Sequence, residues 1–266
     1  SSRREDCSGQ RSQLLGHIAY GFGVVSWLDM DPTPDVEAEA ARTLATIADE
    51  VSQCRACPRL VEWRERVARE KRAAYADQEY WGRGVPGWGD PLASVAVVGL
   101  APAAHGANRT GRMFCGDRSG EWLYRALWRA GFASQPETTS RDDDMVLSDV
   151  WITSPVHCAP PDNKPTIVER DTCVGFLSRE LAALPRLSVV VALGGFGFSV
   201  LSRLYDVRPR PRFGHGVEVA VSRDADSPGS GSTVAGSPGP ILLGCYHVSQ
   251  QNTFTGKLTK PMFHQI

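Results

Sequence analysis

The sequence has almost no excess of charge of either sign, because 29 basic residues stand against 30 acidic ones. This balance excludes an overall basic field that would draw the whole chain to nucleic acid, so any contact with DNA has to come from local patches. The sequence also lacks a hydrophobic run long enough to cross a bilayer. The apolar stretch 14–28 is interrupted by glycines and a histidine and has no secretory cleavage pattern. We expect no membrane partner.

Disulfide bonds are not expected either. Seven cysteines are an odd number, and without a secretory signal they indicate thiols that serve as metal ligands in a cytoplasmic protein. The turn Cys54-x-x-Cys57 presents two thiolates to one metal, and Cys158 and Cys173 would complete a four-sulfur site. The spacing of the four cysteines leaves both zinc and an iron-sulfur cluster open.

Four short apolar runs, the first of them rich in β-branched residues, predict the strands of a mostly parallel sheet covered by helices on both faces: 95–98, 150–153, 189–193 and 241–245. Ser119 is expected to cap the helix after the first strand, and Thr166 with Glu169 forms a capping box for a later helix. We expect one domain over 1–266, with an N-terminal extension and helix at 1–50. The segment 222–240, rich in Ser, Gly and Pro, predicts a flexible insertion loop.

The loops that follow these strands leave the carboxyl ends of the sheet, where open α/β folds bind ligands. Asn reads a base edge, Phe stacks on a base, His donates to a developing anion, and Arg and Lys suit phosphates. These loops carry such residues on one predicted rim: His105, Asn108, Arg109, Arg112, Phe114, Asp117, Asn163, Lys164, His247, Asn252 and Lys257. No loop carries a phosphate-loop or dinucleotide fingerprint, so no nucleotide cofactor is assigned.

Three motifs occur in order along the chain: GLAPAAHGANRTGR at 99–112, CAPPDNKP at 158–165 and HVSQQNT at 247–253. Together with the four cysteines, they resemble the family-5 (type B) uracil-DNA glycosylases, and the resemblance runs from about Cys54 to Lys260. It implies a three-layer α/β/α sandwich around a four-stranded parallel sheet, with a 4Fe-4S cluster on the four cysteines. It further implies base excision repair: a monomer, associated with the nucleoid, that flips uracil or other damaged bases such as hypoxanthine from double-stranded DNA and leaves an abasic site.

The resemblance also implies roles for individual residues. Phe114 matches the ring that stacks on the extruded base, and Asn163 matches the amide that reads the edge of the base. His247 matches the histidine that stabilises charge on the departing base. Asp117 matches the carboxylate that positions water or stabilises the sugar cation.

This chain departs from other branches of the superfamily at the position that activates water. Those branches carry a polar or acidic residue near Leu100 and Ala101, where the side chains are apolar here. We therefore assign water activation to Asp117 first and to His105 second. Ala101 and Asn108 are expected to line the base pocket.

Contacts with DNA are expected from residues beside these motifs: Arg109, Arg112, Lys164, Gln251, Asn252, Phe254 and Lys257. Either Phe254 or Gln251 is expected to fill the gap left by the flipped base. One alternative is a DNA-binding protein without catalysis, in which the cysteines hold a structural metal. A second alternative, a Cys-His acyl-transfer enzyme using Cys115 or Cys245, is disfavoured because no nucleophile elbow is evident.

Overall fold

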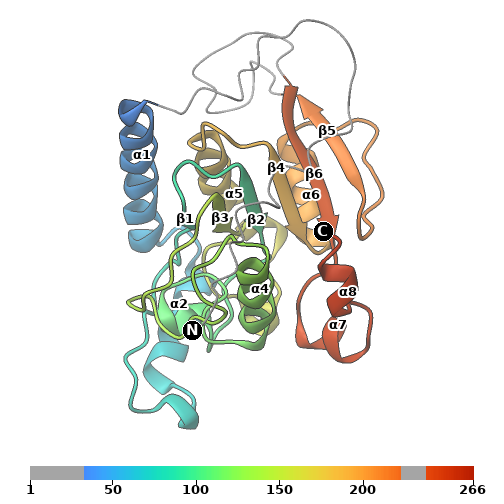
Figure 1. Cartoon of the computed structure of the whole chain (residues 1–266). Helices are drawn as coiled ribbons and strands as arrows, with labels where there is room; N and C mark the ends of the chain where they lie inside the picture. Colours follow the sequence, from blue (N-terminus) through green and yellow to red (C-terminus); the bar gives the residue numbers. More distant parts are fainter. Residues whose placement is uncertain (1–32, 223–237) are drawn as a thin grey trace, which may run out of the picture. The chain divides into compact units, whose positions relative to one another are not determined.

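The computed structural model describes residues 33–222 and 238–266, and Pro34–Ile266 form one compact unit. Residues 1–32 and 223–237, which hold most of the expected N-terminal extension and insertion loop, lie outside the described residues. Within the described ranges, no helix combines the length and apolarity needed to cross a bilayer. The main elements (Figure 1) are α1 (Pro34–Gln53), α2 (Pro58–Glu70), β1 (Trp88–Gly89), β2 (Val95–Val98), α3 (Ala107–Thr110), α4 (Arg118–Arg129), β3 (Val150–Thr153), α5 (Ile167–Ala182), β4 (Val189–Leu193), α6 (Gly195–Leu204), β5 (Glu218–Ser222), β6 (Pro238–Cys245), α7 (Gln250–Phe254) and α8 (Lys260–Phe263).

The sheet contains the four predicted strands at its centre and one further strand at each edge. Its order is β1-β3-β2-β4-β6-β5. Strands β3, β2, β4 and β6 are mutually parallel, which confirms the predicted parallel sheet. The edge strands β1 and β5 pair antiparallel with β3 and β6. The sequence analysis predicted neither edge strand. For β1 the reason is that the strand has only two residues and lies in a glycine-rich segment.

Helices cover both faces of the sheet, which confirms the predicted α/β/α layering. Side chains alternate along each strand, so Val97 and Val191 pack in one hydrophobic cluster with residues of α4. Their neighbours Ala96 and Val190 point to the other face and pack with residues of α1, α5 and α6. Because the central strands are covered on both faces, their sequences read as continuous apolar runs.

Two helix caps decide how the loops after the strands are held. The capping box of Thr166 and Glu169 is present at the start of α5, as predicted. The predicted cap of α4 by Ser119 is wrong: Asp117 is the N-cap residue, and its side chain accepts a hydrogen bond from the backbone N–H of Gly120. Both residue types are good caps, so composition alone did not separate them. The true cap fixes the position of the Asp117 carboxylate.

Candidate active site

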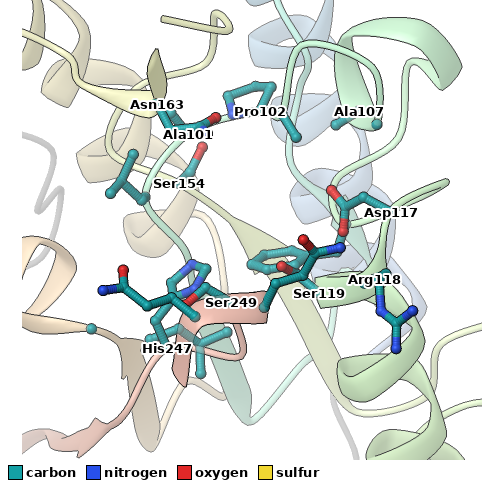
Figure 2. Close-up of a pocket in the computed structure, with 18 of the residues that line it drawn as sticks. Ala101, Pro102, Ala107, Asp117, Arg118, Ser119, Ser154, Asn163, His247 and Ser249 are labelled. Atoms are coloured by element: carbon teal, nitrogen blue, oxygen red, sulfur yellow. The ribbon is translucent and has the colours of Figure 1, made fainter. Parts of the chain in front are cut away.

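The loops leaving the carboxyl ends of the parallel strands enclose a cavity of about 910 Å³, which we call the rim pocket. Its lining includes five of the residues predicted to act on a base: His105, Phe114, Asp117, Asn163 and His247. Figure 2 shows the labelled Asn163, Asp117 and His247 side chains around one open space. The prediction that separate loops share one rim is therefore confirmed for these residues.

Phe114 is held on the wall of the rim pocket by an uncommon backbone conformation. Its φ is +55°, a left-handed value that a bulky residue adopts only when its surroundings enforce it. The absence of a side chain at Gly99 gives the ring its place, since a Cβ there would lie 2.8 Å from Phe114 Cζ. The ring lies 6.3 Å from the His247 ring, with 33° between the planes. This arrangement offers an aromatic face beside an imidazole.

Asp117 brings a carboxylate to the pocket at the start of α4. One oxygen, Oδ1, accepts from Gly120 N at 2.9 Å. The other, Oδ2, faces Gly106, where an added Cβ would lie only 2.5 Å away. Burial raises the pKa of the Asp117 carboxyl above its ordinary value. One oxygen is thus fixed by the cap, and the carboxylate as a whole lines the rim pocket.

His247 follows β6 and enters the pocket as a neutral imidazole. Burial lowers its pKa from 6.5 to about 4, so at neutral pH the ring offers one N–H donor and one acceptor. Its backbone carbonyl accepts from Asn252 Nδ2 at 2.9 Å, which fixes the start of α7 beside it. Gly194 leaves room for the side chain, because a Cβ there would lie 3.3 Å from His247 Cβ. A neutral ring serves as a hydrogen-bond donor without carrying a buried charge.

Asn163 stands at the opposite end of the pocket on a strained turn. Asp162 and Asn163 have φ values of +54° and +56°, in the left-handed region. Two successive residues in this region store strain of the kind that marks functional sites. The Asn163 side chain is exposed and lines the rim pocket, so its amide is free to pair with a ligand.

Three further residues predicted for the pocket differ in their surroundings. Ala101 and His105 line the rim pocket, and His105 Nδ1 lies 3.1 Å from the hydroxyl of Tyr80. Burial, helped by Arg72 and Arg109, lowers the pKa of His105. Asn108 is fully buried and is not part of the lining. Its amide donates to backbone carbonyls of residues 64 and 104, so the structure gives it a positioning role instead of ligand contact.

The structure does not bring the guanidinium groups of Arg109 and Arg112 to the rim as the sequence analysis expected. Both side chains are buried. Arg109 donates to the carbonyls of residues 105 and 116 and to Gln78. Arg112 forms an ion pair with Asp143 and donates to Thr138. Their positive charges are therefore committed within the chain and are not presented to a phosphate.

The remaining residues predicted to contact DNA divide into two groups. Gln251, Asn252 and Lys257 line the rim pocket. Lys164 and Phe254 lie outside its lining, but both are exposed. The Phe254 side chain is 68% exposed on the short helix α7, where the Arg118 guanidinium lies 5.0 Å from its ring. A large exposed apolar ring beside the pocket is what a residue needs in order to fill the gap left by a flipped base, a role we call the wedge.

Sequence reasoning missed several residues that line the rim pocket, among them Arg118, Ser154, Phe196, Tyr246 and Ser249. Ser154 directly follows β3, so its place at a carboxyl end was a usable signal. Its hydroxyl donates to the carbonyl of residue 156, which leaves its lone pairs open. Ser249 caps α7, a role that the pattern Ser-x-x-Asn would also have indicated.

The four predicted cysteine ligands lie near one another, and none of them lines the rim pocket. Charges on Cys54, Cys57 and Cys158 each act to raise the pKa of Cys173, whose value is about 12 mainly because of burial. Cys173 Sγ also accepts the backbone N–H of His157 at 3.3 Å. Across residues 33–222 and 238–266, no group of three or more His, Cys, Asp or Glu side chains is arranged around a single metal ion.

A buried arginine beside the cysteines indicates that their surroundings suit a negatively charged group. Arg64 is 2% exposed, and its Nη1 donates to Cys158 Sγ at 2.8 Å. Its Nε has no hydrogen-bond partner. A buried cation beside sulfur ligands matches the negative charge that thiolate ligands bring to a cluster, so the donor set fits such a group.

The chain is similar in sequence to known proteins over most of its length. Residues 86–266 match the family model of the uracil DNA glycosylase superfamily. The chain is 51% identical over 219 residues to a type-5 uracil-DNA glycosylase of Mycobacterium tuberculosis, covering 81% of this chain and 76% of the relative. It is 48% identical to one of Mycobacterium leprae, with 85% and 93% covered, and 45% identical to one of Thermus thermophilus, with 81% and 91% covered. The chain belongs to the uracil DNA glycosylase superfamily, in its type-5 branch.

Proposed function

We propose that this chain removes uracil, and other deaminated bases such as hypoxanthine, from double-stranded DNA by hydrolysing the N-glycosidic bond. The observation that carries the proposal is the rim pocket, where an aromatic face, an amide, a neutral imidazole and a carboxylate converge. The relatives named type-5 uracil-DNA glycosylases support the same reaction. The product is an abasic site.

In this proposal the flipped base stacks on Phe114, while the exposed amide of Asn163 pairs with its edge. An amide has both a donor and an acceptor, so it matches the adjacent carbonyl and N–H groups of uracil. Hypoxanthine offers a similar carbonyl beside an N–H. This shared edge is the reason to expect activity on both bases.

Bond cleavage then separates charge between the base and the sugar. The C1′–N bond breaks with its electron pair leaving on the base, and a neutral His247 donates a hydrogen bond to the developing anion. The water oxygen bonds to C1′, and its proton passes to the departing base or to solvent. Asp117 Oδ2 stabilises the sugar cation and positions this water, with His105 as the second candidate for the water.

The surroundings of the pocket suggest how DNA is held. Gln251, Asn252 and Lys257 line the pocket and are offered to the backbone of the flipped nucleotide. Exposed Lys164, next to Asn163 along the chain, supplies a further positive charge. Phe254 is the better wedge, because its exposed ring replaces base stacking, which the Gln251 amide does less well. We further propose a monomer that acts in the cytoplasm, at the nucleoid.

We also propose a 4Fe-4S cluster on Cys54, Cys57, Cys158 and Cys173. Bound there, the cluster would link the connection between α1 and α2, the loop after β3, and α5 covalently, which is a structural role. The buried guanidinium of Arg64 beside Cys158 supports a group of net negative charge. Iron and sulfide analysis with the visible spectrum tests this, and a colourless protein with one tightly held zinc would contradict it.

The activity is tested on a duplex oligonucleotide with one uracil, followed by alkali to cleave abasic sites. We expect Asn163→Ala and His247→Ala each to lower the single-turnover rate on the order of 100-fold or more, since each removes one donor. His264→Ala is the matched control, because this exposed histidine lies outside the rim pocket. Near wild-type rates for both site variants would refute the assignment. Duplex binding without any alkali-sensitive product from the wild type would favour the DNA-binding alternative.

A further inference from the structure

Arg64 is a buried cation that forms no ion pair with a carboxylate among the described residues. It lies on the inner face of α2 with Leu60 and Val67, and its side chain is 2% exposed. Its guanidinium donates to Cys158 Sγ at 2.8 Å and to the carbonyl of Cys54 at 2.9 Å. Among the described residues no Asp or Glu forms an ion pair with it, and its Nε has no acceptor.

Elementary electrostatics makes such a position costly. Removing a guanidinium from water costs several kcal/mol unless a negative charge faces it. A carbonyl and a neutral thiol supply only partial charge. The planar fork of Arg64 joins two of the three segments that carry the cysteines, since one nitrogen donates to Cys158 Sγ and another donates to the backbone carbonyl of Cys54. The missing negative charge therefore belongs at the four sulfur atoms.

We propose that Arg64 is the charge partner of the metal centre on these cysteines, and that it governs how firmly the cluster is retained and at which potential it accepts an electron. The inference rests on the proposed 4Fe-4S cluster. Hydrogen bonds to ligand sulfurs and nearby positive charge stabilise the more reduced, more negative state of such clusters. Groups that orient the ligands also control affinity for the metal.

The test compares the loaded wild type with Arg64→Met and Arg64→Lys. Iron loss to a chelator and the reduction potential are measured, and neither depends on glycosylase activity. For Arg64→Met we expect iron loss about 10-fold faster or more, and a potential shifted to a more negative value. Arg64→Lys keeps the charge but loses the planar fork, so its rate of iron loss and its reduction potential should lie between those of the wild type and Arg64→Met.

Arg66→Met is the matched control, because Arg66 lies on the same helix with its guanidinium 4.8 Å from the Trp63 ring and its side chain 43% exposed. It should match the wild type in both measurements. Wild-type values for Arg64→Met would overturn the inference while leaving the cluster intact. If Arg64→Met does not fold, Arg64→Gln, which removes the charge but keeps a polar side chain, takes its place, and wild-type values for Arg64→Gln in both measurements would overturn the inference. A wild-type protein without iron would instead refute the proposed cluster.

Discussion

Replacing His247 by Gln should flatten the acid dependence of stability. The pKa of His247 in the folded chain is about 4, below the ordinary value of 6.5. Between these pH values the imidazole is protonated in the unfolded chain but not in the folded chain. Stability is therefore full above about pH 6.5 and is lost as the pH falls towards 4. At 1.36 kcal/mol per pKa unit, the loss between pH 7 and pH 5 is at most about 2 kcal/mol.

The assay is urea unfolding of wild type and His247→Gln at both pH values, in the same buffer and salt. The wild type should lose more free energy of unfolding than the variant, by at most about 2 kcal/mol. His264→Gln, a change at an exposed histidine, controls for adding an amide elsewhere. An identical pH dependence in wild type and His247→Gln would refute the argument that the imidazole is held neutral by burial.

Two glycine substitutions test the walls of the rim pocket. In Gly99→Ala the new Cβ would lie 2.8 Å from Phe114 Cζ, so the ring must move; we expect about 1–3 kcal/mol of lost stability in urea unfolding, together with slower uracil release. In Gly106→Ala the new Cβ would lie 2.5 Å from Asp117 Oδ2, which strains the cap of α4; we expect about 1 kcal/mol of lost stability and a lower single-turnover rate. Wild-type rates in either variant would show that the displaced side chain does not act on the substrate.

The sequence predicted the central sheet well because its signal is local. Four short apolar runs need no knowledge of distant contacts to be recognised as buried strands. Phe114 and Asp117 lie in the segment that follows the first predicted strand, and His247 lies two residues after the last one. The resemblance to a known family then selected them from the other residues of these segments.

The errors share a different physical cause. Arg112 was assigned to DNA because arginine in a glycine-rich loop suits phosphates, yet its partner Asp143 lies 31 residues further along the chain. Asn108 was expected to line the base pocket, but it is buried in the four-residue helix α3. A helix this short has no repeating pattern that distinguishes its inner face from its outer face. Ion pairs and burial that depend on tertiary contacts cannot be read from local composition.

The antiparallel pairing of β5 with β6 has a consequence for engineering the protein. Ser222 and Pro238 are paired across the two strands, so the 15 residues between them begin and end at adjacent points. Strand β6 runs eight residues from Pro238 to Cys245 before the chain reaches His247. At the usual rise per residue, that is roughly 23 Å of strand. The paired ends of β5 and β6 at Ser222 and Pro238 are therefore suitable places to insert a label or a second domain without reaching the rim pocket.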